Sequence, residues 1–248
     1  MKILVCISHV PDTTSKINFS EDNSQFDTNG VQFVINPYDE FALTRAMWFK
    51  EKQGASVTVA TVGDAKVEPT LRKALAIGAD DAIRIDTAPL DGFQVAKQLA
   101  EIVKSEGFDL VLTGKESIDY NGGMVPGMMA EILGFNFVNA CIGLELDDKQ
   151  ATAVIEIDGG KETLNCSLPL IAAGQKGLVE EKDLRIPNMR GIMMARKKPL
   201  KVVPAIDFNT PSSTIKYEKP EAKGACKIID AGNIDELIQL LHNEAKVI

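Results

Sequence analysis

Residues 108–123 read FDLVLTGKESIDYNGG, a continuous apolar run followed by a polar loop that ends in two glycines. The run up to Gly114 shows no alternation of apolar and polar side chains, which is typical of a strand buried on both faces of a sheet. The loop then leads into an apolar, helix-like segment. A buried strand, a loop and a helix in this order form the repeating unit of a parallel sheet.

The same unit recurs along the first part of the chain. Strand-like runs are predicted at residues 3–7, 31–35, 56–63, 82–85 and 108–114, and amphipathic helical patterns alternate with them. Apolar strands joined by helices indicate a parallel sheet that is covered on both faces. We therefore predict the α/β class, with a doubly wound parallel sheet.

The pattern changes after Gly134. Strand-like segments that begin at Asn139, Thr152 and Thr163 are joined by turns rich in aspartate and glycine. Such spacing favours antiparallel hairpins. We expect an antiparallel excursion here before the chain returns to the edge of the sheet, all within one domain of residues 1–203.

Residues 204–248 form a separate arm in this interpretation, because their proline, serine and charge show little periodicity. The arm ends in a short predicted helix, for which Asn233 and Glu236 make a plausible capping pair. An apolar stripe runs along that helix through Ile234, Leu237, Ile238, Leu241 and Ile248. The stripe must be buried on the same domain or on another chain, and its spacing alone leaves both open.

Composition restricts the classes of protein. The fractions of hydrophobic (45%) and charged (25%) residues are those of a globular protein, and no apolar run approaches the roughly 18 residues of a membrane-spanning helix. The net charge of -8 argues against a nucleic-acid partner. The apolar run near the first residue is too short for the core of a signal peptide. The four cysteines are widely spaced, so we expect free thiols, no metal site and a cytoplasmic protein.

A ligand site is predicted beyond the carboxyl ends of the strands, where open parallel sheets bind ligands. Residues 8–12, 36–38, 62–65 and 114–126 would meet at this edge. Asn121, Gly122 and Gly123 precede a helix-like stretch, so their backbone N–H groups suit an anion such as a nucleotide phosphate. A Gly-Gly pair after a strand is also common in plain turns, and the pattern leaves that reading open.

Catalytic residues are not predicted. Neither His9 nor His242 is flanked by a serine or cysteine arrangement that suggests an activated nucleophile, and Asp119 with Glu116 is more typical of a turn than of an acid–base pair. Residues 189–203, MRGIMMARKKPLKVV, combine methionines with a basic cluster. Methionines adapt to irregular partner surfaces, although a core helix with a solvated basic end gives the same pattern.

Seven segments in this order resemble one family. They read VCISHVPD, INPYDEFAL, VTVATVGDA, ALAIGADDAIRI, DLVLTGKESIDYNGG, EIDGGKETLNCSLP and GIMMARKKPL. Together they resemble the beta subunit of electron-transfer flavoprotein. The resemblance implies an adenine nucleotide alpha-hydrolase-like fold and an alpha subunit that carries a redox-active FAD. It also implies AMP with a structural role in the beta subunit.

The same resemblance implies the site residues. Tyr38 would lie near the flavin, and the AMP pocket would be lined by Cys6, Asn36, Pro37, Tyr38, Asp39, Val62, Lys115, Ser117, Asp119, Asn121, Gly122, Gly123, Met124 and Val125. Met189 would anchor acyl-CoA or related flavin dehydrogenases, with Ile192 and Met193 beside it. The arm, with Ile234 and Leu237, would wrap the alpha subunit.

The sequence also departs from the family pattern. Residues 123–126 read GMVP where the family often has Gly-Gln-Thr/Val-Gly, so phosphate contacts would come from Asn121, Gly122, Gly123 and Val125. Ile155 replaces a common basic residue, and residues 190–191 read Arg-Gly instead of Pro-Asn. A carrier with AMP is expected. A bifurcating type with a second FAD in this chain, and a stand-alone ATP- or AMP-binding stress-type module, are the alternatives.

Overall fold

The computed structural model describes residues 1–222 and 224–248, which divide into two compact units. The first contains Met1–Asn18 and Asp27–Thr214, and the second contains Phe19–Phe26 and Ile215–Ile248. The first unit thus extends past Val203, where we placed the domain boundary.

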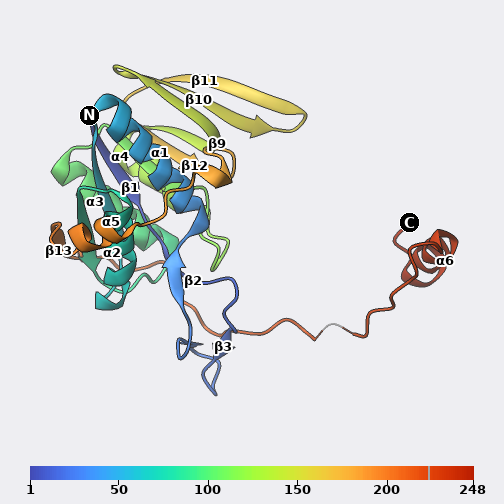
Figure 1. Ribbon diagram of the computed structural model, residues 1–248. Coiled ribbons are helices and arrows are strands. Elements are labelled where there is room, and N and C mark those ends of the chain that lie inside the picture. The colour runs from blue at the N-terminus through green and yellow to red at the C-terminus, as the bar shows by residue number, and fades with distance from the viewer. Residues whose placement is uncertain (223) are drawn as a thin grey trace. The chain divides into compact units, whose positions relative to one another are not determined.

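A nine-stranded sheet forms the centre of the first unit, in the order β11-β10-β9-β12-β8-β1-β6-β7-β13 (Figure 1). Neighbouring strands from β9 to β13 in this order pair in parallel. The bounds of the strands are β1 Lys2–Cys6, β6 Ser56–Val62, β7 Asp81–Asp86, β8 Leu110–Gly114, β9 Asn136–Asp147, β10 Gln150–Ile157, β11 Gly160–Ser167, β12 Leu170–Gly174 and β13 Leu200–Pro204. Every residue of β8 and β12 is buried, as continuous apolar runs require.

Helices cover both faces of the sheet. Their bounds are α1 Pro37–Gln53, α2 Glu68–Ile77, α3 Gly92–Glu106, α4 Val125–Leu133 and α5 Met189–Ala195, with short 3₁₀ turns at Ala65–Val67 and Glu181–Asp183. One core joins the sheet to α1 and α2 through Leu43 and Leu75, and a second joins it to α3 and α4 through Leu99 and Met129. Burying each such side chain contributes about 1.5–3 kcal/mol. The predicted doubly wound α/β fold is confirmed.

One predicted strand lies outside the main sheet. Within residues 31–35, only Phe33–Ile35 forms a strand, β5, and it pairs antiparallel with β2, His9–Pro11. The prediction of a parallel strand was therefore wrong. The segment is only half buried, and Asn36 N donates to Ser8 O (3.0 Å), so β5 returns the chain to the end of β1 instead of crossing the sheet.

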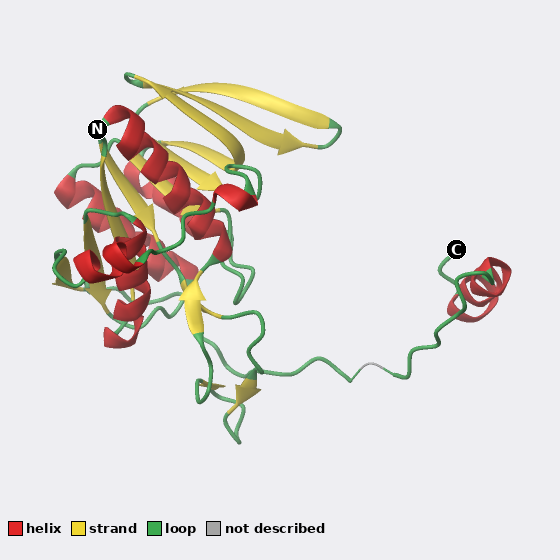
Figure 2. Cartoon of the chain, viewed as in Figure 1, coloured by secondary structure: helices red, strands yellow, loops and turns green. Residues whose placement is uncertain are grey.

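The antiparallel excursion is confirmed, but its return is not at the edge. β10 pairs antiparallel with both β9 and β11, and β10 and β11 project as a long hairpin (Figure 2). The chain then turns at Pro169 and enters the interior of the sheet as β12, between β9 and β8. The sequence LIAAG is apolar throughout, which suits an interior strand and not an edge.

The second unit is smaller and ends in the helix α6, Ile234–Gln239, followed by a π-helical turn at Leu240–Ala245. Near its start, β3 (Asn18–Phe19) pairs with β4 (Phe26–Asp27), and the rings of Phe19 and Tyr217 stack with their centroids 5.0 Å apart. No residue of α6 is buried within this chain. Among the described residues, no helix is both long and apolar enough to cross a membrane.

Candidate functional site

The sheet has a switch point between β1 and β8. The chain leaves β1 toward β6 on one side, whereas it leaves β8 toward β9 and β12 on the other. The carboxyl ends of two such neighbouring strands border the crevice where α/β sheets bind ligands. Asp39, in the first turn of α1, lies at the base of this crevice: its carboxylate accepts hydrogen bonds from Ser8 N (2.7 Å) and Gly114 N (2.8 Å).

The carboxyl group of Asp39 is only 3% exposed, and burial raises its pKa to about 7 although the hydrogen bonds from Ser8, Asn36 and Gly114 oppose that rise. Nearby, burial and the charge of Asp39 raise the pKa of the Cys6 thiol. Burial thus favours the neutral thiol of Cys6 at this edge of the sheet.

Asn36 holds the loop that follows β8. Its side chain is fully buried, donates through Nδ2 to Glu116 O (2.9 Å) and accepts from Ile118 N through Oδ1 (3.2 Å). Pro37 begins α1 directly after it, a position that favours proline because no intrahelical N–H is lost there. Asn36 and Asp39 thus fix the end of β8 and the start of its loop from α1.

The loop closes on itself between Ser117 and Gly122. Ser117 N donates to Gly122 O (3.2 Å), and Asp119 Oδ1 accepts from Ser117 Oγ (2.5 Å) and from Tyr120 N (2.9 Å). Asn121 completes the turn with a positive φ of 50°. Asp119 therefore forms the turn, and this geometry gives it no acid–base role.

The loop ends at the amino terminus of α4. The N–H groups of Val125 and Gly127 lie in the first turn of this helix, where no intrahelical acceptor exists, and Pro126 has none to offer. Met124 precedes the helix without a capping side-chain bond, and its side chain lies against Gly92 at the start of α3. Gly122, Gly123 and the start of α4 thus form a backbone surface suited to an anion.

Lys115 adds a cation to this edge. Its Nζ lies 3.8 Å from Glu116 Oε1 and 5.4 Å from the centroid of the Tyr38 ring. Gly114, just before it, must lack a side chain, because a Cβ there would lie 2.5 Å from Asp39 Oδ1 and 2.6 Å from Tyr38 Cβ. Val62 lies on the other side of β1, at the same edge of the sheet. The structure thus brings the predicted crevice residues to one edge.

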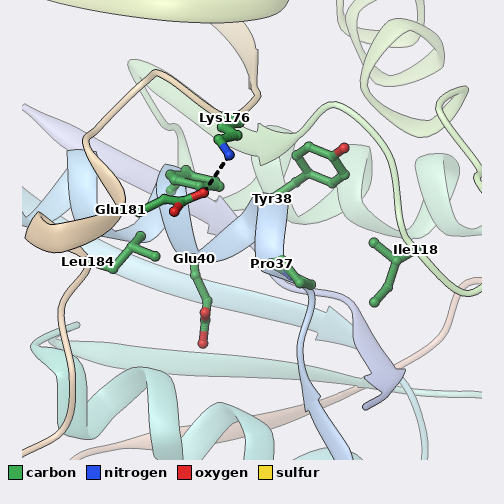
Figure 3. Close-up of a pocket in the computed structure, with 8 residues that line it drawn as sticks. Pro37, Tyr38, Glu40, Ile118, Lys176, Glu181 and Leu184 are labelled. Carbon is green, nitrogen blue, oxygen red and sulfur yellow. Dashed lines mark ion pairs between the residues drawn. The ribbon is translucent and has the colours of Figure 1, made fainter. Parts of the chain in front are cut away.

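A pocket of about 420 Å³ opens beside Tyr38 (Figure 3). It is lined by Pro37, Tyr38, Glu40, Phe41, Ile118, Lys176, Glu181 and Leu184. Lys176 and Glu181 form an ion pair across it (Nζ to Oε1, 2.7 Å). The sequence analysis did not predict Lys176 and Glu181 as site residues, because it placed β12 at the edge of the sheet. An interior parallel strand would have brought the loop after Gly174 to the site.

The predicted partner residues lie on two other helices. Met189, Ile192 and Met193 are exposed on α5, where the side chain of Met189 is 76% accessible. Ile234 and Leu237 are exposed on α6 in the second unit. The residues of α5 take no part in the crevice.

Comparison with known proteins gives the class first: residues 24–208 match the electron transfer flavoprotein domain family. The chain is 35% identical to the electron transfer flavoprotein subunit beta of Bacillus subtilis and 36% identical to that of Syntrophomonas wolfei, over its whole length and at least 98% of theirs. It is 32% identical to the human subunit over 91% of both chains. The chain therefore belongs to the family of electron transfer flavoprotein beta subunits.

Proposed function

We propose that this chain is one half of a heterodimeric electron carrier and is not a catalyst by itself. With an FAD-carrying alpha subunit it would accept electrons from acyl-CoA or related dehydrogenases and pass them to a downstream acceptor. The observation that carries the proposal is the crevice at β1 and β8, whose loop is held by Asn36 and Asp39 in a chain of this family.

AMP fits this crevice through the backbone. The side chains of Asn36 and Asp39 already bond to the protein, so they would hold the loop and leave nucleotide contacts to Gly122, Gly123 and Val125. Lys115 adds positive charge, and Cys6 and Val62 supply an apolar wall for the base. AMP would have a structural role, because an adenine nucleotide has no accessible redox state. Met124 points toward Gly92, so it leaves the backbone accessible to a phosphate.

The pocket beside Tyr38 is the proposed surface for the flavin of the alpha subunit. Phe41, Ile118 and Leu184 supply apolar area, and Tyr38 supplies an aromatic ring. FAD would supply the electron-carrying chemistry, and this chain would orient it and exclude water. The exposed Met189 of α5 is the proposed anchor for the dehydrogenase, and Ile234 and Leu237 of α6 are proposed contacts to the alpha subunit.

The test is to purify the chain with its alpha partner, denature the complex, and identify and count the released nucleotides by mass spectrometry. One FAD and one AMP for each heterodimer are expected. Two FAD and no AMP would mean that this crevice holds a redox cofactor, as in a bifurcating carrier. A chain that binds ATP alone and recruits no alpha subunit would contradict the proposal and favour a stand-alone module.

A further inference from the structure

The helix α5 has two unlike faces. Met189, Ile192 and Met193 point to solvent, whereas Ala195 is buried in the core beside α2. Gly191 also faces α2, and a Cβ at Gly191 would collide with the carbonyl oxygen of Ala76. Small residues on the inner face therefore let the helix pack closely enough to present a fixed outer face.

Near the carboxyl end of each of these two helices, backbone carbonyl groups accept hydrogen bonds from a cationic side chain that belongs to or follows the other helix. Arg72 of α2 donates through Nη1 to Ala195 O (2.8 Å) and Lys198 O (2.8 Å), beyond the end of α5. In return, Lys198 Nζ donates to Leu75 O (2.9 Å) and Ala79 O (2.5 Å), at the end of α2. The last carbonyls of a helix have no intrahelical donor and carry partial negative charge, so both ends gain a favourable cation.

The ammonium group of Lys198 lies in a partly desolvated setting. Burial and the charge of Lys50 lower its pKa, and Asp80 opposes that change. Lys50 itself donates to Gly78 O (2.9 Å) and pairs with Asp80 Oδ1 (2.5 Å). Water would replace a lost Lys198 donor poorly at such a site, because Leu75 and Ala79, which carry the accepting carbonyl groups, are buried.

From this geometry we infer that Arg72 and Lys198 are positioning residues for partner docking: they lock α5 onto α2 and present its methionine face preformed to the electron-donating dehydrogenase. This inference rests on the proposed function, in which Met189 is the docking anchor. A docking helix that is already ordered loses less conformational freedom on binding, so the lock should act on affinity and not on electron transfer after docking.

The experiment uses the intact heterodimer and a flavin-dependent acyl-CoA dehydrogenase reduced by its substrate. Arg72→Met and Lys198→Met, the two lock variants, each remove one pair of side-chain hydrogen bonds between α2 and the end of α5. Lys197→Met is the matched control, because this exposed neighbour loses the same charge. We expect each lock variant to raise the KM for the dehydrogenase about tenfold, with kcat within about twofold. Amide hydrogen exchange in residues 186–198 should speed up in the lock variants and stay unchanged in the control.

Three outcomes separate the proposals. If the KM for the dehydrogenase in both lock variants equals that of Lys197→Met, Arg72 and Lys198 do not position α5 for docking, and the inference is wrong. If Met189→Asp also leaves electron transfer unchanged, α5 is not the docking site for the dehydrogenase. In that case the proposed function itself is contradicted at this helix. If a lock variant does not assemble, Gly191→Ala provides the same KM test, because its Cβ pushes α5 away from α2 without changing a charge; an unchanged KM there overturns the inference.

Discussion

The helices α5 and α6 contain seven and six residues and both expose apolar side chains, yet their own chain supports them differently. Asn188 caps α5, Arg72 binds the carbonyl oxygen of its last residue, Ala195, and Ala195 is buried. In α6 no residue is buried, and Asn233 makes no side-chain cap bond. Helices this short are unstable alone, so α5 is completed by its own domain and α6 needs another surface.

Under the proposed function, the contrast corresponds to two kinds of interface. A surface that is ordered before binding suits brief contacts with successive partners, because little freedom is lost at each encounter. A segment that gains its order on binding suits a lasting partner, which can supply the missing burial. Exposed apolar residues alone do not distinguish the two; the contacts behind them do.

Substitution on α6 should have the largest effect. With Ile234 and Leu237 both replaced by aspartate, the affinity for the alpha subunit should fall roughly a thousandfold, since buried interface anchors contribute about 2 kcal/mol each. The dissociation constant, measured by analytical ultracentrifugation or surface binding, checks this. Gln239→Asp combined with Asn243→Asp adds the same two negative charges at exposed polar residues and is the control.

The distinction between a self-supported α5 and a partner-supported α6 is contradicted if the double variant binds the alpha subunit as tightly as the control does. It also breaks if Met193→Asp on α5 dissociates the heterodimer, because α5 would then serve the stable interface. Retention of the heterodimer in that variant, with weaker electron transfer, would sharpen the distinction.

A smaller, pH-dependent effect is expected at Asp39, within the self-supported unit. Its carboxyl pKa is about 7 in the folded chain against 3.8 ordinarily. Between these values the folded state binds the additional proton, so raising the pH lowers the free energy of unfolding. For this single group the fall is at most about 1.4 kcal/mol per pH unit, and it ends above pH 7.

Asp39→Asn should remove this slope. The amide cannot accept hydrogen bonds at both Ser8 N and Gly114 N, so we expect a loss of about 2 kcal/mol at pH 4. Because the parent loses roughly 4 kcal/mol from this group as the pH rises to 8 and the variant does not, the variant should be the more stable of the two at pH 8. Urea unfolding of the full chain at several pH values measures both. The exposed Asp158→Asn is the control, and equal slopes in the control and in Asp39→Asn would show that another group dominates.

The sequence predicted those parts of the fold that a single local pattern determines. Continuous apolar runs such as LVLTG belong to interior strands, and the Asn36-Pro37 pair at the start of α1 marks a helix start. These two signals were enough to bring residues 36–38 and the loop after β8 to one edge. The role of Asp39 was not predictable, because a carboxylate with two backbone donors from β1 and β8 depends on contacts far apart in sequence.

The misses share a physical cause. The five residues of β12 and the three of β5 are both short and apolar, and local pattern does not tell an interior strand from a two-stranded ribbon. The hydrogen bonds that hold α5 on α2 were also not predictable from the sequence. Arg72 and Lys198 have the pattern of ordinary surface cations, and only the folded chain places the ends of α2 and α5 side by side.

The smallest effect tests the two helix caps directly. Asn188 Oδ1 accepts from Gly191 N (2.8 Å), so Asn188→Ala should cost α5 about 1 kcal/mol. Asn233 instead uses its side chain to donate to Glu236 Oε2 (2.7 Å), so the predicted pair exists but does not cap the backbone. Asn233→Ala should cost no more than about 0.5 kcal/mol, as for an exposed side-chain pair.

Amide exchange at Gly191 and at Leu237 in the intact heterodimer measures the two local stabilities. Faster exchange at Gly191 alone would mean that α5 depends on its own cap while α6 depends on its partner. Equal losses at both sites would mean that α6, too, is held from its amino terminus, and the difference between a self-supported and a partner-supported helix would then have to rest on burial alone.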